Sequence, residues 1–383
     1  MDLNFDDATI AFQAEVREFL AANKDSFPTK SYDTAEGFEQ HRRWDKVLFD
    51  AGLSVITWPE KYGGRDATLL QWVVYEEEYF RAGAPGRASA NGTSMLAPTL
   101  FAHGTEEQLD RILPKMASGE EIWAQAWSEP ESGSDLASLR STATKTDGGW
   151  LLNGQKIWSS RAVFGERAFG LFRSDPEAQR HKGLTYFMFD LKADGVTVRP
   201  IAQLGGDTGF GEIFLDDVFV PDEDVIGGVH EGWKAAMSTS SNERGMSLRS
   251  PARFLAPAER LVAQWKDNPD PAFTDRVADA WIKAQAYRLH TFGTVTRVSN
   301  GGELGAESSI TKVFWSDLDV ALHQTALDLR GADGELAETA GREEASYNWT
   351  DGLLFALGGP IYAGTNEIQR NIIAERLLGL PRK

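Results

Sequence analysis

Two adjacent charged residues in the second half of the chain could carry acid–base chemistry. Glu243 and Arg244 lie in a stretch whose helical periodicity begins near residue 231. A carboxylate in a dry site has a raised pKa, which makes it a better-matched general base near neutral pH. The structural alternative is a solvated Glu–Arg pair on a helix surface. The residues alone leave both readings of Glu243 open.

Four short segments combine hydroxyls, backbone amides, glycines and aromatic side chains that suit a flat, polar ligand. They are Gln125–Asp135, Leu152–Ser160, Gly232–Arg244 and Ile361–Arg370. Taken singly, each has a structural explanation. Trp158 is typical of a core, Thr365 of a helix N-cap and Ser128 of a turn. Only the combination and its order favour a binding site.

The elements that must position these segments fall into three stretches with different periodicity. Apolar residues at helical spacing predict helices within residues 1–120, and the same spacing returns from residue 231 to the end. Short β-rich runs bounded by turn residues fill residues 121–230. The predicted helices are 8–22, 69–80 and 106–117, and the predicted strands are 150–158, 168–172, 184–191, 196–200 and 212–220.

The predicted fold class is therefore α+β. It consists of an N-terminal α-helical domain (1–120), a middle β-barrel domain with antiparallel strands (121–230) and a C-terminal four-helix bundle (231–383). Asn153-Gly154 is expected to form a turn. Loops are expected at 266–271 and 331–341.

The composition excludes several classes of function. The chain has no cysteine, which removes thiolate catalysis, disulfides and Cys-ligated metals. A formal net charge of −18 argues against nucleic-acid and anionic-membrane partners. No apolar run is long enough for membrane insertion, and the acidic N-terminus is unlike a signal peptide, so we expect a cytoplasmic protein.

Several common catalytic motifs are absent from the sequence. It contains no nucleophile elbow, phosphate-binding P-loop or Rossmann fingerprint. The glycines of residues 205–211 lie between two predicted strands and are interpreted as a β-turn. The six histidines lack metal-ligand spacing, and no metal site is expected.

Together, the four segments resemble the acyl-CoA dehydrogenase family over nearly the whole chain. The family includes bacterial members that act on fatty-acyl and sterol side-chain CoA esters. The resemblance implies an FAD-dependent enzyme that converts an acyl-CoA to the trans-2-enoyl-CoA. A carboxylate takes the α-proton while a hydride leaves the β-carbon for flavin N5.

The resemblance also assigns residues around the flavin ring. Ser128 matches a hydroxyl that contacts the ring, and Gln125 and Trp127 belong to the same cofactor-binding segment. Trp158 matches the tryptophan beside the isoalloxazine. Ser160 matches a threonine that hydrogen-bonds near N5.

Other matched positions serve the dinucleotide and the substrate. Thr365 and Glu367 match residues that hold the dinucleotide part of FAD. Gly133 and Ser134 match a Gly–Ser pair between flavin and acyl-CoA. Arg244 is expected on the substrate side, next to the base.

The position of the base departs from the commonest family pattern. Many members carry the glutamate just before the Gly-Thr of the fourth segment, where this chain has Ala363. Other members place it on the first helix of the C-terminal bundle, where Glu243 lies. The resemblance thus favours Glu243 as base, while the backbone N–H of Ala363 keeps its role as a donor to the enolate oxygen.

Two further departures concern contacts that family members make to a neighbouring subunit's FAD. Pro269–Phe273 replaces an Arg-x-x-Phe-Gly motif, and Asp328 replaces a glutamine before Gly331–Gly334. An aspartate near a pyrophosphate would repel it. The chain is expected to form either a heterotetramer with a related subunit or a homo-oligomer that holds FAD by other contacts.

The remaining alternatives concern electron flow and catalytic competence. The expected electron acceptor is an electron-transfer flavoprotein. An acyl-CoA oxidase that uses oxygen is the first alternative. The second is a non-catalytic partner subunit, in which the flavin-site residues would be expected to have degenerated.

Overall fold

The computed structural model describes residues 5–244, 250–302, 304–336 and 348–382, without the side chains of 241–244. The chain forms two compact units that are each discontinuous in sequence. The first, the helical unit, comprises Met1–Ser31, Asp66–Gly86 and Arg244–Lys383. The second, the sheet unit, comprises Tyr32–Arg65 and Arg87–Glu243.

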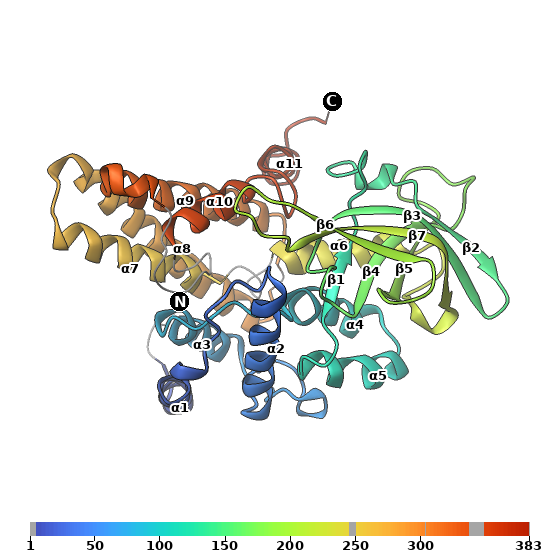
Figure 1. Ribbon diagram of the computed structural model, residues 1–383, viewed down its shortest axis with the longest axis horizontal. Helices are drawn as coiled ribbons and strands as arrows, with labels where there is room; N and C mark the ends of the chain where they lie inside the picture. The colour runs from blue at the N-terminus through green and yellow to red at the C-terminus, as the bar shows by residue number, and fades with distance from the viewer. Residues whose placement is uncertain (1–4, 245–249, 303, 337–347, 383) are drawn as a thin grey trace. The chain divides into compact units, whose positions relative to one another are not determined.

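A single eight-stranded sheet organises the sheet unit (Figure 1). Its hydrogen-bonded order is β6-β7-β3-β2-β4-β5-β8, and β1 pairs with β4 beside this path. The pairs β1–β4 and β2–β4 are parallel and the others antiparallel. The strands are β1 Trp123–Ala126, β2 Thr142–Thr146, β3 Gly149–Ser160, β4 Arg167–Arg173, β5 Leu184–Asp190, β6 Val196–Ile201, β7 Phe210–Pro221 and β8 Val225–Ile226.

β3 is one long strand with two irregularities in its pairing with β7. The first lies between Leu152 and Gly154, and Gly154 has a φ of 141°. Only glycine adopts that conformation readily, so the chain bulges here without reversing direction. The predicted turn at Asn153-Gly154 is therefore wrong. The second irregularity, between Lys156 and Ser159, brackets Trp158.

The sheet unit also contains helices that precede and follow the strands in the sequence. α5 begins with a capping box in which Thr105 and Gln108 satisfy each other's backbone N–H groups. A π-helical turn, Gly92–Leu96, leads directly into α4. The helices are α2 Ala35–Asp50, α4 Ala97–His103, α5 Glu106–Ala117 and α6 Gly232–Arg244.

The helical unit contains the long C-terminal helices and two N-terminal ones. Its core is a cluster of apolar side chains in which Phe254 stacks on Trp315 with ring centroids 5.9 Å apart. α3 packs against α1, α7 and α8, and α9 packs against α7, α8, α10 and α11. The helices are α1 Asp7–Ala22, α3 Leu69–Arg81, α7 Ala252–Asp267, α8 Thr274–Ser299, α9 Ser308–Leu329, α10 Trp349–Gly358 and α11 Asn366–Ile372.

The predicted fold class is confirmed, with helical, β-rich and helical regions in that order. The helices predicted at 8–22, 69–80 and 106–117 correspond to α1, α3 and α5. The pairing is mixed where an antiparallel arrangement was predicted, because β1 joins β4 in parallel. The domain boundaries at residues 120 and 230 stay a prediction.

Three further predictions concern loops. A turn spans residues 203–206, closed by the Gly206 N–H on the Gln203 carbonyl at 3.0 Å, and it overlaps only the start of the predicted turn at 205–211. The predicted loop at 266–271 lies between α7 and a 3₁₀ turn, Pro271–Phe273. The loop predicted at 331–341 begins with a 3₁₀ turn, Gly331–Glu335, and residues 337–341 lie outside the described ranges.

Within the part of the chain that the structure describes, no helix has the length and apolar character to cross a bilayer.

Candidate active site

The loop that leaves β1 joins the first two predicted segments. The Ser128 carbonyl accepts a hydrogen bond from Ile157 N on β3 at 2.8 Å. The preceding residue, Trp127, donates its indole N–H to the Tyr186 hydroxyl on β5 at 3.0 Å. Ser128 is therefore held against the part of β3 that leads to Trp158.

Trp158 has an unusual conformation for a large residue. Its φ is 60°, and its side chain is 56% exposed. The indole meets Phe210 of β7 edge-on, with centroids 5.9 Å apart. Left-handed backbone at a bulky residue is a genuine outlier, and such strain clusters at ligand sites. An exposed aromatic ring held this way is a platform for a flat ligand.

A buried ion pair involves Lys156, two residues before Trp158 on β3. It was not predicted from the sequence. Lys156 is completely buried, and its ammonium donates to Glu129 Oε1 at 2.8 Å and to the Leu171 carbonyl at 2.7 Å. The Glu129 carboxylate also accepts from the backbone N–H groups of Arg140 at 2.6 Å and Ser141 at 3.0 Å. The pair therefore connects the loop after β1 to strands β3 and β4.

Opposite effects set the ionisation of this pair. Burial alone would raise the pKa of Glu129, but the Lys156 charge and the three hydrogen bonds hold that pKa below its ordinary value. Burial lowers the pKa of Lys156, against the attraction of Glu129. Removing either partner would leave the other buried and unpaired, so the pair is stable only when both are present.

The residues around Trp158 fit a planar cofactor. A Cβ added at Gly133 would meet no atom within 4 Å, so a ligand can approach that backbone closely. Ser134 is exposed and Ser160 is half-buried, opposite Phe210 in the sheet register. The Gln125 Nε2 is buried, and in the described part of the chain it has no hydrogen-bond partner. A buried donor without a partner is one that a bound polar group could satisfy.

A chain of buried hydroxyls fixes helix α6 in the same unit. Tyr186, which receives the Trp127 N–H, lies 3.3 Å from the Thr239 hydroxyl on α6. Thr239 in turn lies 2.7 Å from the hydroxyl of Thr99 on α4, and all three side chains are fully buried. Glu243 and Arg244 are the last two residues of α6, and their side chains lie outside the description.

The remaining predicted residues belong to the helical unit. Thr365 is the N-cap of α11, and its hydroxyl accepts from Ile368 N at 3.2 Å. Glu367 is exposed, and hydrogen bonds from its own N–H and from Thr365 lower its pKa. Immediately before them, Ala363 and Gly364 both have left-handed backbone, with φ of 57° and 80°.

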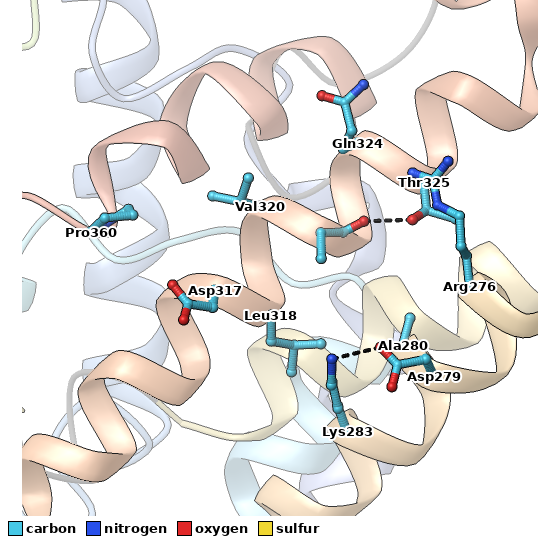
Figure 2. Close-up of a pocket in the computed structure, with 11 residues that line it drawn as sticks. Arg276, Asp279, Ala280, Lys283, Asp317, Leu318, Val320, Gln324, Thr325 and Pro360 are labelled. Carbon is cyan, nitrogen blue, oxygen red and sulfur yellow. Dashed lines mark hydrogen bonds and ion pairs between the residues drawn. The ribbon is translucent and has the colours of Figure 1, made fainter. Parts of the chain in front are cut away.

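A shallow cavity of about 360 Å³ lies between α8 and α9 and contains none of the predicted site residues (Figure 2). Arg276, at its edge, forms an ion pair of 2.8 Å with Asp328, the residue predicted to repel a pyrophosphate. Gln324 also donates to that carboxylate at 2.8 Å. The Asp328 charge is therefore partly compensated within the chain.

The structure thus brings together the predicted residues in two groups. The sheet unit holds seven on β1, on the loop after it and on β3: Gln125, Trp127, Ser128, Gly133, Ser134, Trp158 and Ser160. The helical unit holds Thr365 and Glu367 at one turn. Sequence reasoning missed Glu129, Lys156 and Thr239. Lys156 shares the alternate positions of Trp150, Leu152 and Trp158, and that register was the available signal for it.

Comparison with known proteins adds to this geometry. Models of the acyl-CoA dehydrogenase N-terminal, middle and C-terminal domains match residues 6–120, 124–218 and 230–378. The chain is 37% identical over 385 residues to acyl-CoA dehydrogenase IpdE1 of Mycobacterium tuberculosis, covering 97% of this chain and 98% of the relative.

Solved structures show the same likeness along the whole chain. The Tcur3481–Tcur3483 steroid acyl-CoA dehydrogenase superposes with a TM-score of 0.88 at 27% identity, covering 100% of both chains. The ChsE4–ChsE5 complex of Mycobacterium tuberculosis superposes with a TM-score of 0.83 at 25% identity, again covering 100% of both chains.

Proposed function

The chain belongs to the acyl-CoA dehydrogenase family and is an FAD-dependent oxidoreductase, and on this premise we propose that Glu243 is its catalytic base. In the proposed reaction, Glu243 removes the α-proton of an acyl-CoA thioester. Bound FAD supplies the acceptor for the hydride that leaves the β-carbon. The product is the trans-2-enoyl-CoA.

One observation carries the choice of Glu243. The hydroxyl chain Trp127–Tyr186–Thr239 ties α6 to the loop that precedes the flavin-facing residues. Glu243 is four residues beyond Thr239 in the sequence of α6, and a spacing of four in a helix supports the proposal because such residues share a face. Ala363 carries no carboxylate that could act instead.

The other predicted residues keep their proposed roles in binding. The exposed indole of Trp158, with Gln125, Trp127, Ser128 and Ser160, would hold the flavin ring. Gly133 and Ser134 would lie between the ring and the acyl-CoA, with Arg244 on the substrate side. Thr365 and Glu367 would hold the dinucleotide part of the cofactor.

We further infer that the chain works with a related but different subunit and acts on a bulky acyl group. Residues 269–273 contain a short 3₁₀ turn, Pro271–Phe273, capped by Asp270, and the sequence has no arginine there, where the family pattern has one. The structural relatives Tcur3481–Tcur3483 and ChsE4–ChsE5 are two-component proteins, and the first is described as a steroid dehydrogenase.

The test of the base is Glu243→Gln, with Glu231→Gln at the start of the same helix as the matched control. The Glu243→Gln protein should keep its yellow flavin and lose about 10²–10⁴-fold in turnover, the usual contribution of a general base. The control should retain activity. Undiminished turnover in Glu243→Gln would disprove this assignment.

The test of the partner is size-exclusion chromatography with absorbance recorded at flavin wavelengths. A colourless chain that gains flavin when a related subunit is co-expressed supports the two-component enzyme. A yellow homo-oligomer contradicts it. Turnover with an electron-transfer flavoprotein, without hydrogen peroxide formation, separates the proposed dehydrogenase from an oxidase.

A further inference from the structure

Lys312, on α9, is completely buried and donates to an amide oxygen. Its ammonium lies 2.7 Å from the Asn366 Oδ1. The Ser316 hydroxyl donates to the same oxygen at 3.1 Å, and the Asn366 Nδ2 donates to Asp317 at 3.1 Å. Removing an ammonium from water costs several kcal/mol. An apolar side chain would pack α9 without that cost, so the lysine calls for a specific role.

The network holds the turn that precedes α11. Asn366 donates its backbone N–H to the Pro360 carbonyl at 2.8 Å, which closes the turn. Gln369, also buried, donates from its side chain to the carbonyls of Ala363 at 3.4 Å and Gly364 at 3.3 Å. Lys312 therefore fixes Asn366, and Asn366 fixes the turn on α9.

The turn itself is strained and has unused donors. Ala363 has a φ of 57°, which costs an L-residue about 1–2 kcal/mol compared with right-handed backbone. Such a conformation persists only where its surroundings enforce it. Among the described residues, the N–H groups of Ala363 and Gly364 donate to no acceptor. Ala363 is half-buried, so the residue is not enclosed by the protein.

We propose that Lys312, acting through Asn366, is a positioning residue that aims the Ala363 N–H at the thioester oxygen. This inference rests on the proposed function, because the donor matters only when negative charge develops on that oxygen as the α-proton leaves. A preorganised backbone donor stabilises such a charge without reorganising during the reaction. Lys312 itself touches neither substrate nor cofactor in this account.

The experiment compares Lys312→Met with Lys283→Met in the flavin-loaded protein. Lys283 is the matched control because it is a lysine of the same unit whose ion pair, at 2.6 Å, is with Asp279 and not with Asn366 (Figure 2). Lys312→Met should lower kcat per bound flavin about 10–100-fold, with KM nearly unchanged, because the donor is misplaced. Lys283→Met should leave both constants unchanged.

Two further readouts exclude a merely structural effect. With α-deuterated substrate, the isotope effect on kcat should grow in Lys312→Met, because proton removal becomes more rate-limiting. Amide hydrogen exchange of residues 360–366 should accelerate, and this measurement needs no turnover. Unchanged kcat per flavin, or a loss of kcat with an unchanged isotope effect, would overturn the proposal.

A milder variant covers the case in which Lys312→Met does not fold. Ser316→Ala removes one of the two bonds to the Asn366 oxygen and should produce the same changes in smaller measure. Glu243→Gln should leave the exchange of residues 360–366 unchanged. Failure of the base assignment is therefore distinguishable from failure of the positioning role.

Discussion

Each of the two groups of candidate site residues has a completely buried lysine close to it in the sequence or bonded to it. The two lysines differ in the group to which they donate a hydrogen bond. Lys156, in the sheet unit, donates to the Glu129 carboxylate at 2.8 Å. Lys312, in the helical unit, donates to the neutral amide of Asn366 at 2.7 Å. The first lysine lies two residues before Trp158, and the second bonds to the residue three after Ala363; both Trp158 and Ala363 have left-handed backbone.

The two hydrogen-bond networks suit different structural roles. A carboxylate with a bonded lysine and two backbone donors is a rigid junction that joins a loop to two strands. An amide both accepts from Lys312 and donates to Asp317, so Asn366 can orient a turn without adding charge beside a developing oxyanion. The segment that contains Trp158 is therefore anchored by a charge pair, and the turn that contains Ala363 by an amide relay.

The largest expected effect comes from breaking the charged junction. Lys156→Met should cost about 3–5 kcal/mol of unfolding free energy, because it leaves the Glu129 carboxylate buried and unpaired. Bound flavin should be lost with it, since Trp158 lies two residues beyond the lysine. Urea denaturation and flavin absorbance measure the two effects. Lys145→Met, which removes an exposed ion pair with Asp222, is the control and should cost at most about 1 kcal/mol.

The second prediction concerns a buried carboxylate, Asp45, whose hydrogen bond comes from a backbone N–H and not from a lysine ammonium. Asp45, on α2, accepts from Ser89 N at 2.9 Å, and its burial raises its pKa to about 6 from an ordinary 3.8. Because the folded pKa exceeds the unfolded one, stability falls as pH rises from about 4 to 6 and stays lower above that range. Above about pH 6, the raised pKa of Asp45 lowers the free energy of unfolding by about 3 kcal/mol.

Asp45→Asn should remove this cost while keeping the acceptor for Ser89. The variant should be more stable than the wild type at pH 7.5 and nearly equal to it at about pH 3.5, below the unfolded pKa of Asp45, as measured by denaturant unfolding. Equal stabilities at both values would show that the nearby Arg87 and Arg161 charges already compensate Asp45, as Lys156 does Glu129.

The smallest expected effect concerns the cap beside the amide relay. Thr365→Ala removes the hydroxyl that accepts from Ile368 N and should cost about 1 kcal/mol. Serine at this position should restore the stability, since it retains the hydroxyl. If alanine is tolerated without loss, Lys312 and Asn366 alone fix the start of α11.

Periodicity predicted the long elements because their residues repeat one face over many turns or strand pairs. α5 and β3 are examples, with α5 carrying its capping box in the sequence itself. β1 was missed because four residues, three of them fully buried, show no alternation. Likewise, Asn153-Gly154 gives the same local signal in a bulge as in a turn, and only its pairing with β7 distinguishes them.

The sequence identified individual residues of the candidate site but did not show how they are arranged in space. Ser128, Trp158 and Thr365 could be found because they lie in recognisable segments. Glu129 and Lys156 are 27 positions apart, and Lys312 and Asn366 are 54 apart. Contacts at such separation depend on the packing of strands and helices, which a single sequence does not specify.

The most direct test of the account is anaerobic mixing of the flavin-loaded protein with a panel of acyl-CoAs, linear, branched and steroidal. The account predicts that the flavin absorbance bleaches with a bulky acyl-CoA, that the enoyl-CoA is formed in equal amount, and that Glu243→Gln abolishes both changes. Full flavin occupancy with no bleaching by any acyl-CoA would contradict it.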